Sequence, residues 1–254
     1  MKKFFSHSLS LFLVVCLLLT ATPVSAQNTT ATSNVFYYDY TDLDGNVVGK
    51  QKKEVTLGAP VHDSNGTIHV TVTEVISFEL NDDFDLKDKL NTTTRTTTFS
   101  HDKLGNNYID NELVTPLEVN DDFSSLDSGG HWKYTNYNCD SQTQCYLYTG
   151  SGVSYNLQDV HNAYKEKYLV KNSTNNPTIS DFKLYATQAA NSVSIYNNSG
   201  IAYALAIAGT TGAIPFVNAI AAIIAGGTAI ALAYQGYSAW KDLNDAMKNA
   251  YSIL

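Results

Sequence analysis

The residues of this chain that could act on a substrate are scattered rather than grouped. Serine hydrolases, zinc proteases and phosphate-binding loops carry the patterns G-x-S-x-G, H-E-x-x-H and G-x-x-x-x-G-K-[ST], and the sequence contains none of them. The Ser- and Gly-rich stretches SSLDSGGH and TGSGVS have the composition of turns. No catalytic residue is therefore predicted, and the chain is expected not to be an enzyme.

The histidines and carboxylates do not fall at metal-ligand spacing either. The histidines beyond the N-terminal region are His62, His69, His101, His131 and His161, and the first two are too far apart for a pair on one helical turn. Three aspartates before Gly45 resemble the start of a calcium loop. Aligned on this glycine, however, the first and twelfth ligand positions would be Tyr40 and Gln51. We expect no metal and no cofactor, and interpret Asp44 and Gly45 as a type I′ hairpin turn.

Two cysteines, Cys139 and Cys145, are expected to form a disulfide. They are the only cysteines left once Cys16 is removed with the signal peptide described below, and an even pair in an exported chain favours a bond that closes a small loop. The alternative is two reduced thiols. A metal site is less well supported, because no further ligands can be identified.

The N-terminal region has the features of a secretory signal peptide. Lys2 and Lys3 precede an apolar run, and the small-residue triplet Val24 to Ala26 supplies a cleavage site, so residues 1–26 are left out of fold reasoning. The chain carries 16 basic and 24 acidic residues; loss of the two lysines leaves 14 basic residues and a formal charge of −10. An acidic secreted chain is a poor partner for nucleic acid and for anionic lipid.

The residue pattern predicts an α+β fold, with an N-terminal antiparallel β module and a C-terminal helical module. After a flexible N-terminus at 27–33, alternation of period two marks a β-rich module over 34–155. Its clearest strand is TIHVTVTEVISFEL, where apolar residues alternate with polar ones and Glu74 is interpreted as a bulge. Further strands are expected in TTTRTTTFS, NYIDNELV, HWKYTNYN and CYLYTGSG, with Cys139 and Cys145 at the two ends of the hairpin loop between the last two.

A helical period begins near residue 156 and defines a helical module over 156–254. NLQDVHNAYKEKYLV is predicted as a short helix, and a second helix is expected to follow Pro177, capped by Ser180 and stopped by NNSG. A last amphipathic helix is expected in SAWKDLNDAMKNAYSIL.

Between these helices lies an unusual segment. Leu184 to Trp240 spans 57 residues with no Asp, Glu, Lys, Arg or His. Within it, residues 201–234 are predicted to form an apolar helical hairpin that turns at GTTG. Its second helix, Ala213 to Tyr234 with Pro215 in the first turn, would be about 33 Å long, close to the hydrocarbon thickness of a bilayer.

Three interpretations of this hairpin compete: a buried core of a soluble domain, a permanent C-terminal anchor, and a segment that is soluble on secretion and inserts into a target cell. Small residues spaced for close helix approach favour the third. The residues expected to insert are Ile207, Pro215, Phe216, Ile220, Ala222, Ile223, Ile224, Gly226, Gly227, Ile230 and Leu232. Tyr234, Tyr237 and Trp240 are expected to lie at the membrane interface.

A polar secreted body followed by the charge-free hairpin 201–234 resembles large secreted pore-forming bacteriocins of the geobacillin type, with a hairpin similar to that of colicins. The resemblance covers the last third of the chain, its size and its signal peptide. It implies a secreted antibacterial toxin whose partner is a target bacterial membrane, with a surface receptor and a homo-oligomer in the membrane as further expectations. The alternative is a surface or matrix protein whose β module binds glycan or protein.

Overall fold

The computed structural model describes residues 32–114, 134–140, 143–152, 163–198 and 230–254. Residues from Ala31 to Leu254 form one compact unit, and the expected module boundary at 155 falls outside the described residues. The strands are β1 (Thr32–Thr41), β2 (Val47–Leu57), β3 (Val61–His62), β4 (Ile68–Leu80), β5 (Thr93–His101), β6 (Asn107–Ile109), β7 (Glu112–Leu113), β8 (Thr135–Cys139), β9 (Gln144–Gly150) and β10 (Tyr164–Val170). The helices are the short 3₁₀ turn η1 (Lys87–Lys89), α3 (Asn176–Asn198) and α6 (Ile230–Ile253).

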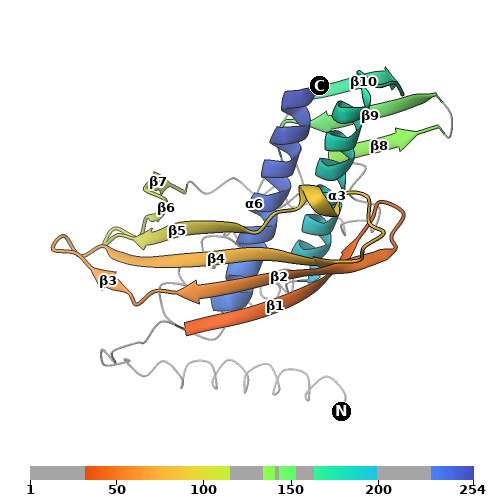
Figure 1. Cartoon of the computed structure of the whole chain (residues 1–254). Helices are drawn as coiled ribbons and strands as arrows, with labels where there is room; N and C mark the ends of the chain where they lie inside the picture. Colours follow the sequence, from red (N-terminus) through yellow and green to blue (C-terminus); the bar gives the residue numbers. More distant parts are fainter. Residues whose placement is uncertain (1–31, 115–133, 141–142, 153–162, 199–229) are drawn as a thin grey trace, which may run out of the picture. The chain divides into compact units, whose positions relative to one another are not determined.

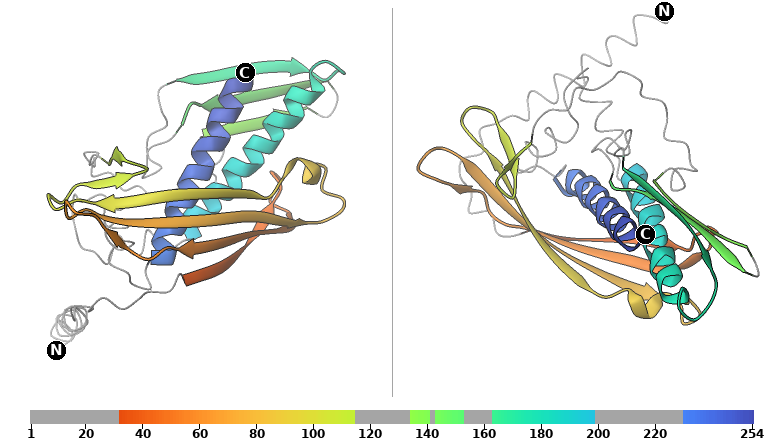
Figure 2. Two further views of the ribbon diagram at one scale, coloured as in Figure 1. Left: turned by 60° about the vertical axis from the view of Figure 1, so that its left-hand side comes forward. Right: turned by 90° about the horizontal axis from the view of Figure 1, so that it is seen from above.

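The predicted α+β class is confirmed. A seven-stranded antiparallel sheet has the order β1-β2-β4-β5-β6-β7, with β3 paired to β4, and a second sheet has the order β10-β9-β8. Viewed from above, α3 and α6 lie between the two sheets (Figure 2). The packing agrees, because Tyr234 and Tyr237 of α6 pack with Phe99 of the large sheet, whereas Phe182 of α3 packs with Leu147 of the small sheet.

The two helices run antiparallel, side by side (Figure 1). Val193 near the end of α3 packs with Leu243 of α6, whereas Phe182 near its start packs with Ala250. Asn198 and Ile230, the last described residue before and the first after the undescribed segment 199–229, therefore lie at the same end of the helix pair.

Strand β4 confirms the predicted alternation but not the bulge at Glu74. Its registers with β2 and β5 are continuous, and Glu74 points to the same inner face as Val72 and Ile76. Glu74 interrupts the apolar row of this strand. The structure instead buries this carboxylate completely and gives it partners.

The hairpin between β1 and β2 is confirmed, but its turn is not of type I′. That type needs positive φ at both central residues, whereas among residues 42–46 only Gly45 has it, at 84°. The Asp42 carboxylate accepts the backbone N–H groups of Asp44 and Asn46, at 3.0 and 2.8 Å. The same arrangement recurs at Asp102 before Gly105, with φ 87°.

The predicted helix over NLQDVHNAYKEKYLV is wrong where the structure describes it. Residues 164–170 form β10, which pairs with β9 and buries Leu169. Tyr164 and Tyr168, four apart, share one face of a helix and also one face of a strand, so their spacing did not separate the two. On β10 their rings pair with Tyr148 and Tyr146 of β9, at centroid distances of 5.6 and 4.8 Å.

Helix α3 and the final helix confirm two predicted helices with altered bounds. Helix α3 starts at Asn176, so the predicted cap at Ser180 is wrong, because this residue lies inside the helix. Pro177 lies in the first turn, where a missing N–H costs nothing. Helix α6 runs without a break from Ile230 to Ile253, so the sequence predicted to end one helix at Tyr234 and start another at Ser238 belongs to one element. Among the described residues, no helix is long and apolar enough to cross a bilayer.

Candidate functional site

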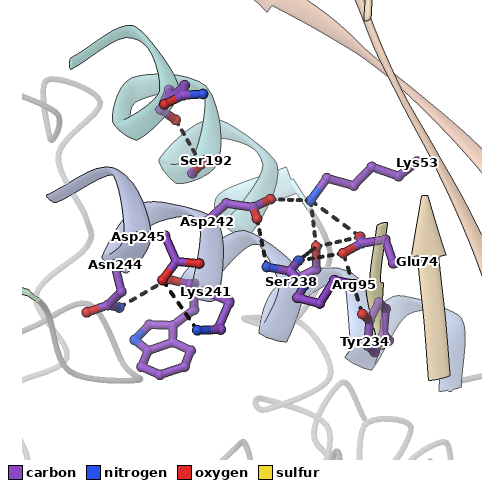
Figure 3. A network of polar contacts seen from close by, with 12 residues as sticks. Lys53, Glu74, Arg95, Ser192, Tyr234, Ser238, Lys241, Asp242, Asn244 and Asp245 are labelled. Atoms are coloured by element: carbon purple, nitrogen blue, oxygen red, sulfur yellow. Dashed lines mark hydrogen bonds and ion pairs between the residues drawn. The ribbon is translucent and has the colours of Figure 1, made fainter. Parts of the chain in front are cut away.

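Helix α6 and the large sheet are joined by a buried network of charged side chains. Lys53 of β2, Glu74 of β4 and Arg95 of β5 point from neighbouring strands toward α6, where they meet Ser238 and Asp242 (Figure 3). Arg95 and Glu74 are directly opposite in the β4–β5 register. Because side chains on the same face of neighbouring strands lie close together, the three strands bring three charged side chains together beneath α6.

The contacts within this network are short and the groups are deeply buried. Lys53 Nζ lies 2.6 Å from Asp242 Oδ2 and 3.6 Å from Glu74 Oε1, and the Lys53 and Glu74 side chains are fully buried. Arg95 donates to Glu74 and lies 3.0 Å from Asp242 Oδ1. The Ser238 hydroxyl lies 2.6 Å from both Glu74 Oε1 and Lys53 Nζ. Two cations thus face two carboxylates, and the cluster has no net charge.

Asp242, Arg95 and the adjoining Tyr234 have shifted pKa values. Burial opposes ionisation of Asp242, but the charges of Lys53 and Arg95 outweigh it and hold the pKa of this carboxyl below its usual range. For Arg95, burial opposes the charge while Asp242 and Glu74 raise the pKa of the guanidinium. Burial, followed by the charge of Glu74, raises the pKa of Tyr234. The lowered pKa keeps Asp242 ionised further into the acid range than an ordinary aspartate.

A second polar cluster places a serine, a histidine and an aspartate in a chain. His69 Nδ1 lies 2.7 Å from Ser100 Oγ, and His69 Nε2 lies 3.1 Å from Asp63 Oδ2. This order is that of a nucleophile, a base and an orienting carboxylate. Ser100 is only 2% exposed, however, so its hydroxyl cannot meet a substrate in this conformation. The cluster is better explained as cross-strand support on the outer face of the sheet.

The structure describes only part of the predicted membrane-inserting set. The following predicted residues lie outside the described residues: Ile207, Pro215, Phe216, Ile220, Ala222, Ile223, Ile224, Gly226 and Gly227. Ile230 and Leu232 belong to the first turn of α6. Their insertion stays a prediction.

The three residues predicted as interfacial anchors lie in or beside the core. Tyr234 and Tyr237 are 0% and 3% exposed and pack edge-on against Phe99, at centroid distances of 6.1 and 5.3 Å. Trp240 is partly buried against the clusters on both sides of α6. An anchoring role for them stays a prediction, and it requires α6 to leave the sheet.

The predicted disulfide between Cys139 and Cys145 is present. The two residues face each other in the β8–β9 register and close the loop between these strands. Cys145 is fully buried and packs with Leu147 and Phe182. The bond therefore ties the hairpin of the small sheet to the core under α3.

Sequence reasoning missed Lys53, Glu74 and Arg95 as a cluster, although a signal was present. Glu74 stands an even number of residues from Val72 and Ile76, so its parity places it on the apolar face. Lys53 has the same relation to Val55 in β2. Charged residues in phase with a buried row indicate an internal ion network.

Among the described residues, no group of three His, Cys, Asp or Glu side chains is arranged to hold a metal. Comparison of the chain with protein families, curated proteins and solved structures found no match.

Proposed function

We propose that the protein is a secreted antibacterial toxin that permeabilises target-cell membranes through the apolar segment between α3 and α6. The observation that carries the proposal is the chemistry of this segment: residues 199–229 contain no Asp, Glu, Lys, Arg or His, and they form the middle of a charge-free stretch of 57 residues that runs from Leu184 in α3 to Trp240 in α6. A charge-free segment of this length can enter hydrocarbon without the cost of burying a charge.

The placement of the segment's ends supports the proposal. Asn198 and Ile230 lie at the same end of the antiparallel helix pair. A segment attached in this way can leave the body as a unit, since both of its ends start from one place. The described body, with its two sheets and the disulfide, can remain folded while the segment acts.

The experiment compares dye release from lipid vesicles by the mature chain, Gln27 to Leu254, and by the variant Ala222→Lys. A lysine at the middle of a membrane helix costs about 3 kcal/mol, which corresponds to a loss of roughly 100-fold in insertion. The matched control is Asn197→Lys, which adds the same charge at an exposed position in the last turn of α3. We expect release by the parent and the control and a strong loss in Ala222→Lys.

Point substitutions test this better than a chain ending at Gly200. Such a truncation would remove α6, whose Leu243 and Met247 are fully buried in the core, so a loss of release would not distinguish insertion from misfolding. Equal release by Ala222→Lys and the parent, with both folded by circular dichroism, contradicts insertion of this segment. No release by the folded parent at any lipid composition or pH favours the surface-binding alternative.

A further inference from the structure

A cavity of about 380 Å³ lies between the inner face of the large sheet and the two helices. Tyr40 of β1 and Gln51 of β2 line its sheet side, together with Arg95 of β5, while Asp245 and Asn249 of α6 line the helix side. Its volume falls in the range of small-molecule sites, and its walls come from elements far apart in sequence. A ligand there would contact both the sheet and α6.

Two residues of this cavity carry buried polar atoms without a hydrogen-bond partner. These atoms are the Tyr40 hydroxyl and Arg95 Nε. Tyr40 is 1% exposed, and burial raises the pKa of its hydroxyl, so the group is a neutral donor. Such unpaired buried groups are uncommon in folded proteins because each costs stability. Neither atom has exposed surface in this conformation, but both belong to residues that line the cavity, so a shift of either side chain would present a donor to an oxygen acceptor of a ligand.

The charges around the cavity favour a neutral ligand. Lys89, Arg95, Asp242 and Asp245 line it, so the two signs are balanced. Each of these four side chains already has an ion partner. An anionic ligand would meet two carboxylates and a cationic ligand would meet Arg95, and both would lose hydration without finding an unpaired opposite charge.

The remaining lining groups match a molecule rich in hydroxyls. The amides of Gln51, Asn91, Gln188 and Asn249 and the hydroxyl of Thr93 all line the cavity. Amides offer donors and acceptors together, and a hydroxyl of a sugar can serve either kind of partner. The partly exposed ring of Phe78, whose centroid lies 5.3 Å from that of the buried Tyr40, adds an apolar surface for the C–H face of a sugar ring.

We propose that this cavity binds one or two neutral sugar units of a glycan. A sugar hydroxyl accepts hydrogen bonds from Tyr40 and Arg95, while other hydroxyls bind the amides and the Asp245 carboxylate. Because the Tyr40 hydroxyl and Arg95 Nε are buried, binding includes a side-chain shift at the floor of the cavity. The proposal goes beyond the membrane function and does not depend on it, since sugar binding is measured without lipid.

The test is calorimetric titration of the full mature chain with defined sugars. The neutral probes are glucose, galactose, N-acetylglucosamine, cellobiose, lactose, maltose and chitobiose, and the charged comparators are glucosamine and glucuronic acid. We expect saturable binding of at least one neutral probe and weaker binding of both charged sugars. Absence of binding by every neutral probe, or tighter binding of a charged sugar, overturns the proposal.

Two matched pairs of variants locate the binding. Thr93→Trp fills the cavity from β5, whereas Thr94→Trp places the same ring on the opposite face of the same strand. Tyr40→Phe removes the unpaired hydroxyl, whereas Tyr37→Phe makes the same change at a residue that is 56% exposed. We expect at least tenfold weaker binding in the first member of each pair and unchanged binding in the second.

The melting temperature distinguishes a variant that has lost the binding site from one that has lost the fold. Tyr40→Phe deletes a buried polar group that has no partner, so its melting temperature without sugar is expected to equal or exceed that of the parent. Equal affinity in Tyr40→Phe, Thr93→Trp and the parent contradicts this site even if a sugar binds elsewhere.

Discussion

The substitution Glu74→Gln tests the ion network that joins α6 to the large sheet. The Glu74 carboxylate is fully buried and contacts Arg95, Lys53 and the Ser238 hydroxyl. The amide replacement keeps the shape of the side chain but removes its charge. Two buried cations then share the single carboxylate of Asp242, and the cluster carries a net positive charge.

The size of the effect follows from burial. Removing one partner of a buried ion pair costs about 3–5 kcal/mol, because the other charge stays out of water without compensation. The side chains of Arg95 and Asp242 are 18% and 20% exposed, so water can partly solvate the charges that remain. We therefore expect a loss of about 3 kcal/mol in the free energy of unfolding, or roughly 6–12 °C in Tm for a unit of this size.

The assay is urea unfolding followed by circular dichroism, with Glu79→Gln as the matched control. Glu79 lies on the same strand but is exposed, so its substitution should change the free energy by less than about 0.5 kcal/mol. Adding Lys53→Met to Glu74→Gln restores charge balance and should recover part of the loss. If Glu74→Gln lowers the free energy of unfolding by less than about 1 kcal/mol, the network does not hold α6 on the sheet.

Three further predictions concern Asp242, the disulfide and the turn at Gly45. The pKa of Asp242 is lowered in the folded protein. Its contribution to the free energy of unfolding is therefore complete above the pKa of the unfolded state and is lost as the pH falls through the pKa of the folded state. The difference in stability between the parent and Asp242→Asn should be constant from pH 8 to 5 and close only below about pH 4. Replacing both Cys139 and Cys145 by Ser should lower the free energy of unfolding by about 2 kcal/mol, because the closed loop is short; no change in the urea midpoint would contradict this. Gly45→Ala should cost about 1 kcal/mol from its φ of 84° alone, since no atom lies within 4 Å of the added carbon, while Gly45→Asn, which tolerates that φ, should cost less; equal losses would exclude backbone strain as the cause.

Periodicity predicted the elements whose burial pattern is simple. The alternation in β4 follows directly from the sequence, because this strand buries one face. The apolar stripe of α3 was enough to predict a helix, although the structure buries residues on more than one side of it. Strand β10 was missed because its tyrosines are exposed and lie at a spacing that suits helix and strand alike. Only pairing with β9, which no local pattern contains, decides between the two.

The candidate site was harder to predict than the fold. Lys53 and Asp242 are 189 positions apart, and their contact depends on how α6 docks onto the sheet. The parity of Glu74 shows that a carboxylate is buried, but it does not show which helix supplies the neighbouring serine and aspartate. Likewise, the cavity at Tyr40 exists only after α3, α6 and the sheet are assembled.

The ion network also bears on how the apolar segment could be released. Because the pKa of Asp242 is lowered, mild acid does not protonate this residue and does not release α6 from the sheet through it. If undocking of α6 limits membrane action, Glu74→Gln should accelerate dye release at pH 7 while Glu79→Gln does not. The opposite result is an unchanged rate of dye release from a Glu74→Gln protein that is folded but measurably less stable. It would mean that the segment acts while Tyr234 and Tyr237 stay in the core. The predicted role of these tyrosines as interfacial anchors would then be wrong.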